Sequence, residues 1–202
     1  MPVSQANEAS TLLRLARAYG ICARLFSPHA AAAVESGALG ELAETSEWLG
    51  TAGASERLRR LADEAPLSLQ MLQADYVRLF VRPDVPPYET SHTTAPGAAA
   101  GKTQQLADVA GFYAAFGFQV RGERPDHIAP ELEFVALTCV KEAYALVCDD
   151  EEGATTCREA RATFVEEHLL PWLPEFGRRL AEQRAHPVFT VTADIVLALC
   201  HG

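Results

Sequence analysis

Two side chains with acid–base and hydrogen-bonding chemistry, Asp126 and His127, stand directly before an expected helix start. Pro130 suits the first turn of that helix, because the N–H it lacks would be unpaired there in any case. Glu131 and Glu133 follow, where the positive end of the helix dipole favours carboxylates. The helix then needs no cap from Asp126 or His127, so we expect both to be free for a ligand. The alternative is a turn-forming or capping aspartate beside a surface histidine.

A second motif, the run 97–103 (GAAAGKT), resembles a phosphate-binding loop. In the pattern G-x-x-x-x-G-K-[ST], backbone amides cradle phosphates and the lysine reaches the outer ones. Here the motif is one residue too short, and Pro96 stands where the first glycine belongs. No strand pattern precedes it, which favours a linker ahead of a helix. A helical nucleotide-binding enzyme that uses Lys102 and Thr103 is the alternative.

Metal and thiol chemistry are not indicated by the spacing of their usual ligands. Glu89 and His92 have E-x-x-H spacing, which brings two ligands together only on a helix, and here they follow two prolines in a loop. The five cysteines lack C-x-x-C or zinc-site spacing and predict reduced, mostly buried thiols: Cys22, Cys139, Cys148, Cys157 and Cys200. A hydrolase pairing a cysteine with His127 or His168 is another form of the enzyme alternative. We expect no catalytic residue, no metal ligand and no cofactor.

The composition limits the class of protein and of partner. The 202 residues are 49% hydrophobic, which suits one domain over residues 1–202 with one large core. A formal charge of -10, from 27 acidic and 17 basic residues, argues against nucleic acid and favours a basic partner. The N-terminus lacks an export-signal pattern, and the longest apolar tract, 188–200, is shorter than the roughly 20 residues that span a bilayer. We therefore expect a cytoplasmic protein with no stable membrane insertion.

The elements that must position these residues are helices. No segment shows sustained two-residue alternation, so we predict an all-α, single-domain helical bundle. Expected helices cover residues 11–26, 38–49, 55–62, 67–80, 103–116, 131–149, 155–170 and 175–184, and a last helix begins at Pro187. Between the middle helices, segment 81–101 is rich in Pro, Gly, Ser and Thr, and loops of about twenty residues in compact domains tend to be functional or disordered.

Four sequence blocks, taken in order, carry a family resemblance. They are DYVRLF at 75–80, PPYETS at 86–91, ERPDHIAPELEF at 123–134 and HLLPWLP at 168–174. Together they resemble the TorD/DmsD family of redox-enzyme maturation chaperones. The resemblance implies an all-helical cytoplasmic chaperone, not an enzyme. Such a chaperone binds the N-terminal leader, often a twin-arginine signal, or the apo catalytic subunit of a molybdopterin-containing oxidoreductase. A nitrate-reductase type of assembly factor, or a client without an export leader, stays open.

The resemblance also implies a leader-binding surface. Its residues are Tyr76, Leu79 and Phe80 before the long loop, Pro87, Tyr88, Glu89 and Ser91 within it, and Asp126 with His127 after it. Aromatic and aliphatic members would contact the apolar part of a leader, and carboxylates of Glu89 and Asp126 would take its guanidinium groups. For the set from the helix, ordinary core packing is the alternative, because an apolar helical stripe is usually buried.

Overall fold

The computed structural model describes residues 3–50, 52–63, 69–93 and 98–201, and these residues are helical without a strand, which confirms the all-α class. In chain order the helices are α1 (Val3–Leu25), α2 (Ala30–Glu35), α3 (Ala38–Trp48), α4 (Ala52–Asp63), α5 (Leu69–Tyr76), the π turn η1 (Val77–Val81), the 3-10 turn η2 (Glu89–Ser91), α6 (Ala98–Ala115), α7 (Ile128–Val147), α8 (Glu151–Phe164), the π turn η3 (Val165–Leu169), α9 (Leu173–Glu182) and α10 (Pro187–His201).

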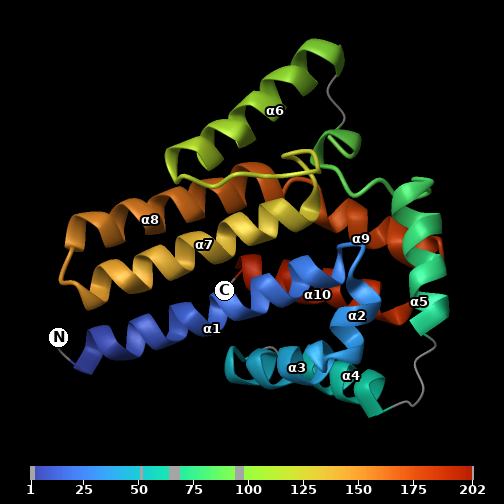
Figure 1. Cartoon of the computed structure of the whole chain (residues 1–202), viewed down its shortest axis with the longest axis horizontal. Helices are drawn as coiled ribbons and strands as arrows, with labels where there is room; N and C mark the ends of the chain where they lie inside the picture. Colours follow the sequence, from blue (N-terminus) through green and yellow to red (C-terminus); the bar gives the residue numbers. More distant parts are fainter. Residues whose placement is uncertain (1–2, 51, 64–68, 94–97, 202) are drawn as a thin grey trace.

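Helix α7 lies at the centre of the bundle, between α1 and α8 (Figure 1). Helices α3 and α4 pack together on the far side of α1 from α7, α5 and α9 lie at the end of the bundle opposite the α7–α8 turn, and α10 runs from that end back along α1 (Figure 1). Helix α6 projects from the bundle, and its C-terminal end leads into segment 116–127 ahead of α7. The two segments that flank α6 in sequence are thereby brought to the same end of α7.

The core contains two groups of aromatic rings. One surrounds Phe26 and includes Tyr76, Phe80, Phe176 and Phe189, with ring centroids 5.1 to 6.5 Å apart. The other surrounds Phe134 of α7 and gathers rings from α6, the segment after it and α8: Phe112, Tyr113, Phe116, Phe118 and Phe164. Burial of such rings contributes much of the hydrophobic stabilisation of a domain, so these groups fix the ends of α5, α6 and α7.

The observed helices begin and end at residues that differ from several sequence expectations. Helix α1 starts before residue 11, because nothing in its first turns breaks a helix, and α2 was not expected. Ser55, at which the expected helix 55–62 was to start with the serine as its cap, lies inside α4 and donates its hydroxyl to the Ala43 carbonyl oxygen at 3.0 Å. The long loop is shorter than expected, since η2 forms within it and α6 begins at Ala98. Pro66, the expected head of a helix, lies outside the described residues.

Two of the expected helices, 67–80 and 155–170, finish in a π turn instead of continuing as regular helix. The π turns carry Leu79 and Phe80 in η1 and His168 in η3. The residue after each turn donates its N–H to the carbonyl oxygen of the first residue of the turn. Arg82 donates to Val77 and Leu170 donates to Val165, both at 2.9 Å. Such π turns occur often at functional sites, so the side chains of η1 and η3 are candidates for a functional role.

Candidate functional site

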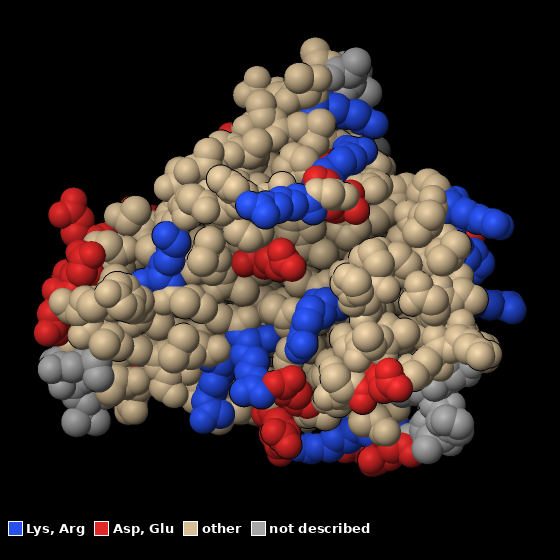
Figure 2. All heavy atoms as spheres, viewed as in Figure 1, with Lys and Arg blue, Asp and Glu red and all other residues tan. Residues whose placement is uncertain are grey.

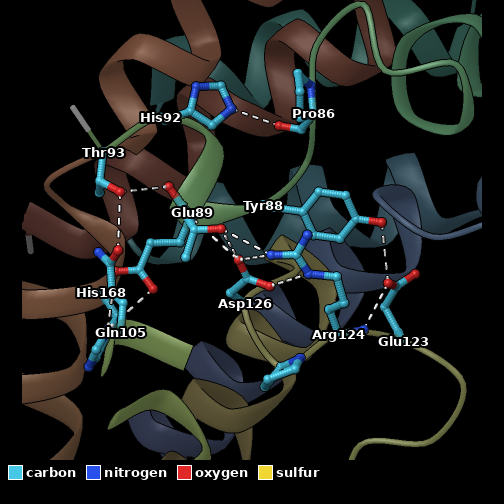
Figure 3. A network of polar contacts seen from close by, with 12 residues as sticks. Pro86, Tyr88, Glu89, His92, Thr93, Gln105, Glu123, Arg124, Asp126 and His168 are labelled. Carbon is cyan, nitrogen blue, oxygen red and sulfur yellow. Dashed lines mark hydrogen bonds and ion pairs between the residues drawn. The ribbon is translucent and has the colours of Figure 1, made fainter. Parts of the chain in front are cut away.

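Segments 86–93 and 123–128 meet along their backbones, and we call this meeting the loop junction. Tyr88 and His127 form an isolated antiparallel bridge. The Glu89 N–H donates to the Asp126 carbonyl oxygen and the Ile128 N–H donates to the Pro87 carbonyl oxygen, each at 2.9 Å. These bonds bring six of the nine expected binding residues to one place: Pro87, Tyr88, Glu89, Ser91, Asp126 and His127. Figure 3 shows Tyr88, Glu89 and Asp126 of this set.

His127 caps helix α7, which corrects the expectation that it would be free. Its backbone is extended, with φ -80° and ψ 139°, and its Nδ1 accepts from the Ala129 N–H at 3.0 Å. The helix starts at Ile128, three residues earlier than expected, so it does use His127. The side chain is buried, and burial lowers the pKa of His127 from its usual value, with Glu123 and Asp126 opposing the effect. The neutral imidazole is the form that can accept this capping hydrogen bond.

Asp126 is also fully buried and its carboxylate is occupied by neighbours within the protein. Oδ2 accepts from the Thr90 hydroxyl at 2.7 Å and from the Thr90 N–H at 3.3 Å. Arg124 donates from Nε to Oδ1 at 3.0 Å and from Nη2 to Oδ2 at 2.8 Å, a two-point contact of guanidinium with carboxylate. The expectation that Asp126 is free for a ligand is therefore wrong for the structure as it stands.

The guanidinium group of Arg124 is held by three residues, Tyr88, Thr90 and Asp126, and we call these three residues the guanidinium clamp. The guanidinium carbon of Arg124 lies 4.3 Å from the centre of the Tyr88 ring, within the range of a cation–π contact. Nη2 also donates to the Thr90 hydroxyl oxygen at 3.0 Å. The Arg124 side chain is 46% exposed, whereas Asp126 beneath it is not exposed. Figure 3 shows the guanidinium between the Tyr88 ring and the Asp126 carboxylate.

Tyr88 and Glu123 form the outer edge of the junction. The Tyr88 hydroxyl donates to Glu123 Oε1 at 3.4 Å, and the Arg124 N–H donates to the same oxygen at 2.8 Å. Tyr88 is half-buried, and burial together with the Glu123 carboxylate raises the pKa of its hydroxyl. Ser91, at the end of η2, is exposed. These groups are the members of the junction that a ligand can reach without any rearrangement.

Glu89 faces the opposite direction, into the protein. It is completely buried, accepts from the Gln105 amide at 3.0 Å, and lies 3.1 Å from Nδ1 of His168 in η3 (Figure 3). Burial raises the pKa of Glu89, although His168 and Gln105 oppose the effect. His92, its E-x-x-H neighbour, instead contacts the Pro86 carbonyl oxygen through Nε2 at 2.7 Å and stacks on Trp172. Glu89 therefore links the loop junction to α6 and η3.

The three expected binding residues from the end of α5 lie in the core. Tyr76, Leu79 and Phe80 are 4%, 0% and 5% exposed, and both rings belong to the aromatic group around Phe26. Their positions match the packing alternative, although the Tyr76 hydroxyl lies close enough to Glu123 and Tyr88 for both to add to the effect of burial, which raises the pKa of Tyr76 to about 12. Their contact with a leader stays a prediction, and it requires the core to open.

Two hollows border segment 117–125, which leads into the junction. An apolar hollow of about 470 Å³ is lined by α6 and this segment, including Ala110, Tyr113, Phe118 and Val120. An acidic hollow of about 290 Å³ lies between this segment, the chain after α1 and the start of α7, and includes Glu123, His127 and Glu133. Both hollows include Glu123 and Val120. The junction is thus flanked by apolar surface on one side and exposed carboxylates on the other.

Glu131 does not have the exposed position that its place near a helix start suggested. Its carboxyl is completely buried, and neither oxygen has a hydrogen-bond partner among the described residues. The nearby Trp172 indole N–H donates to the His168 carbonyl oxygen instead, at 2.6 Å. Burial, with the Glu89 and Asp126 carboxylates adding to it, raises the pKa of Glu131 well above its usual value. The protonated carboxyl is therefore the favoured form in the folded protein.

The residues of the enzyme alternative do not form a catalytic arrangement among the described residues. Lys102 and Thr103 lie within α6, and the described chain has no strand ahead of them to build a phosphate-binding loop. All five cysteines are free thiols. Burial raises the pKa of Cys139 and of Cys200 to about 11, which favours the unreactive thiol over the nucleophilic thiolate.

The surface is uneven in charge, and its apolar helices are short. Figure 2 shows acidic side chains at the α7–α8 turn, where Asp149, Asp150, Glu151 and Glu152 are all exposed, while acidic and basic side chains are interspersed across the middle of the same face. Among the described residues, no helix combines the length and the apolar character required to cross a bilayer.

Comparison with known proteins places this chain in a class. Residues 43–178 match the family model described as the nitrate reductase delta subunit. The chain is 37% identical over 138 residues to the selenate reductase assembly chaperone protein of Thauera selenatis, covering 64% of this chain and 68% of that protein. It is 29% identical over 147 residues to chaperone protein TorD of Vibrio cholerae, covering 71% and 64%. It is 32% identical over 123 residues to the chlorate reductase assembly chaperone protein of Ideonella dechloratans, covering 59% and 62%.

These matches, an all-helical fold and the four sequence blocks define a redox-enzyme maturation chaperone scaffold. The chain belongs to the TorD/DmsD family of redox-enzyme maturation chaperones. It spans about two thirds of the length of the curated relatives it matches. No solved structure matches it significantly.

Sequence reasoning missed several residues of the site. Thr90, Gln105, Arg124 and His168 hold the junction together, yet none was expected to. Of these four, only Arg124 could have been suspected from the sequence, because an arginine two residues before an aspartate in a loop can form an ion pair with that aspartate. The other three come from separate elements, and their pairing depends on the tertiary fold.

Proposed function

We propose that this chain is a cytoplasmic, non-enzymatic chaperone for a molybdopterin-containing oxidoreductase. It binds the N-terminal leader, often a twin-arginine signal, or the apo form of the catalytic subunit, and holds that client back from export until the cofactor is inserted. Family membership supports this role, as do relatives named as assembly chaperones of selenate and chlorate reductases.

The guanidinium clamp is the observation that carries the proposal for where a leader binds. The protein already holds one guanidinium there, that of Arg124, between the Tyr88 ring and the Asp126 carboxylate. An arginine of a leader matches the same three features: a flat aromatic face, a buried carboxylate and a hydroxyl acceptor. A leader arginine enters the clamp by displacing Arg124, whose side chain is the exposed layer of the site.

The surroundings of the clamp suit the rest of a basic, partly apolar leader. The apolar hollow beside Tyr113 and Phe118 accepts its apolar side chains. A second leader arginine lies against Glu123 or Glu133 in the acidic hollow. The roles expected of Glu89 and Asp126 thus divide: Asp126 contacts the guanidinium, whereas Glu89, which faces His168, holds the loop in place. The net charge of -10 speeds encounter with such a leader and makes binding sensitive to salt.

Calorimetric titration with a synthetic twin-arginine leader tests this proposal. A leader whose two arginines are replaced by lysine is the matched ligand control, because lysine keeps the charge but cannot make the flat two-point contact. Glu123→Gln is the site variant, and Glu159→Gln, at an exposed position on α8, is the matched protein control. We expect saturable binding that weakens with salt, with the lysine swap and in Glu123→Gln, but not in Glu159→Gln.

Absence of binding by a folded protein would overturn the leader-binding proposal while leaving family membership intact. The client would then have to be recognised through its mature body, which co-purification with the apo subunit measures. Stoichiometric GTP binding abolished by Lys102→Ala would instead support the enzyme alternative.

A further inference from the structure

A buried histidine nitrogen that makes no hydrogen bond among the described residues lies beside two exposed carboxylates outside the loop junction, with Oδ2 of Asp108 3.4 Å away from it. His168 is 2% exposed, and its Nε2 atom has no hydrogen-bond partner among the described residues. Asp108 of α6 and Glu167 of η3 each bring a carboxylate oxygen to it, so that the three possible ligand atoms lie within 4.8 Å of one another. A buried imidazole nitrogen without a partner is costly, so its position calls for a ligand.

The other side of the imidazole is already fixed. Nδ1 lies 3.1 Å and 3.3 Å from the two oxygens of Glu89, and Gln105 donates to the same carboxylate. Because a carboxylate accepts, we assign the ring proton to Nδ1, which leaves the Nε2 lone pair directed at Asp108 and Glu167. A histidine whose second nitrogen donates to a carboxylate is the usual arrangement of a metal-binding imidazole, since the carboxylate sets its tautomer and orientation.

We propose that Asp108, Glu167 and His168 bind a divalent cation of the zinc class. One imidazole and two carboxylates suit Zn²⁺ better than Mg²⁺ or Ca²⁺, which prefer oxygen ligands throughout. With zinc–ligand bonds of about 2.0 Å, two ligands of a tetrahedral site stand roughly 3.3 Å apart. Nε2 of His168 and Oδ2 of Asp108 are 3.4 Å apart, close to that ligand–ligand distance. Glu167 is exposed and long enough to close the remaining gap by rotation of its side chain.

Three protein ligands leave a fourth position open to water or to a group of a partner. The site joins α6, which projects from the bundle, to η3 (Figure 1). Through His168 and Glu89 it also connects with the loop junction. A bound cation would therefore hold α6 against η3, and sequence spacing could not predict it, because Asp108 is about sixty positions away from the adjacent Glu167 and His168.

Calorimetric titration of the full chain with Zn²⁺ tests the site. Cys148→Ser is used as the background, because Cys148 is an exposed thiol that could bind zinc by itself. We expect one equivalent of Zn²⁺ to bind and neither Mg²⁺ nor Ca²⁺ to compete. Asp108→Asn and Glu167→Gln should each weaken Zn²⁺ at least tenfold, and Glu166→Gln, an exposed neighbour outside the cluster, should leave it unchanged.

Both ligand variants change exposed side chains, so circular dichroism should report an unchanged fold. Glu89→Gln, which acts on His168 from the opposite side, should weaken Zn²⁺ by about 10- to 100-fold. Zn²⁺ should also slow amide exchange along α6 in the background protein but not in Asp108→Asn. No stoichiometric binding, or binding that Asp108→Asn leaves unchanged, would overturn the proposal and leave His168 and Asp108 as an ion pair alone. These titrations use no client, so their outcome is independent of leader binding.

Discussion

The guanidinium of Arg124 lies over the ring of Tyr88, with its central carbon 4.3 Å from the ring centre, and donates to the carboxylate of Asp126. Arg124 thereby covers two of the expected binding residues, Tyr88 of segment 86–93 and Asp126 of segment 123–128. The clamp is consequently closed in the free protein, and binding of a leader arginine requires an exchange of one guanidinium for another.

Arg124→Ala should raise the affinity for an arginine leader about fivefold, because removal of the resident guanidinium ends a competition worth about 1 kcal/mol at an exposed site. The affinity for the lysine-swapped leader should change less. Calorimetry measures both, with Arg60→Ala, an exposed arginine on α4, as the control. A lower affinity for the arginine leader in Arg124→Ala would mean that Arg124 only holds the loops together.

Asp126→Ala should lower the free energy of unfolding by about 2–3 kcal/mol, since it leaves the Thr90 hydroxyl and the Arg124 guanidinium without their acceptor. Leader affinity should fall by about 1–3 kcal/mol through loss of the charged hydrogen bond. Urea unfolding and calorimetry separate the two effects. Thr90→Val, which removes a single hydroxyl, should cost only about 1 kcal/mol of stability. Leader affinity unchanged in folded Asp126→Ala would exclude Asp126 from the binding site.

His127→Ala should lower the free energy of unfolding by about 1 kcal/mol through loss of the α7 cap, whereas His127→Asn, which can also cap, should retain most of it. The pKa of His127 is lowered in the folded protein. Its contribution is therefore complete above the unfolded-state pKa of about 6.5 and is lost as the pH falls below that value. Urea unfolding between pH 5 and 8 measures both effects. Equal stability of the alanine and asparagine variants would contradict the capping role.

Glu131→Gln should gain stability over the wild type as the pH rises. The raised pKa of Glu131 means that its contribution is full below the unfolded-state pKa of about 4.3 and is lost as the pH rises through the folded-state pKa. A neutral amide avoids this loss, so the difference in unfolding free energy should grow by about 1–3 kcal/mol between pH 5 and pH 8. The contribution of His127 has the opposite sign but is common to both proteins. A difference that does not vary with pH would show that Glu131 ionises normally.

Phe80→Ala should lower the free energy of unfolding by about 3–5 kcal/mol, because the ring packs against Phe26, Phe176 and Phe189. Phe80→Leu, which keeps an apolar side chain, should cost much less. If Phe80 acts only in the core, Phe80→Leu binds the leader like the wild type in calorimetry. A large loss of affinity in stable Phe80→Leu would instead support the expected contact with the leader.

The fold class was predictable because helical periodicity persists along most of the chain and two-residue alternation is missing from it. Helix ends were less predictable, since they depend on tertiary contacts: α7 starts at Ile128 because His127 is held by the backbone bridge to Tyr88 and can cap it. The loop residues expected to bind a leader do lie together, but the burial of Glu89, Asp126 and His127 was not foreseen. The spacing of Arg124 and Asp126 allows the two to pair but does not require it, and the contact of Glu89 with His168 joins elements far apart in the sequence.

The two π turns have a consequence for changes in chain length. Successive residues of a regular α-helix lie about 100° apart around its axis, whereas a π turn takes in one extra residue, so the side chains inside it point in directions that a regular helix would not give them. Deletion of Val165 would return η3 to regular helix and swing His168 away from Glu89. The same loss in η1 would turn Phe80 out of the ring cluster. Each π turn should therefore tolerate substitution of an exposed residue more readily than deletion of any residue within it.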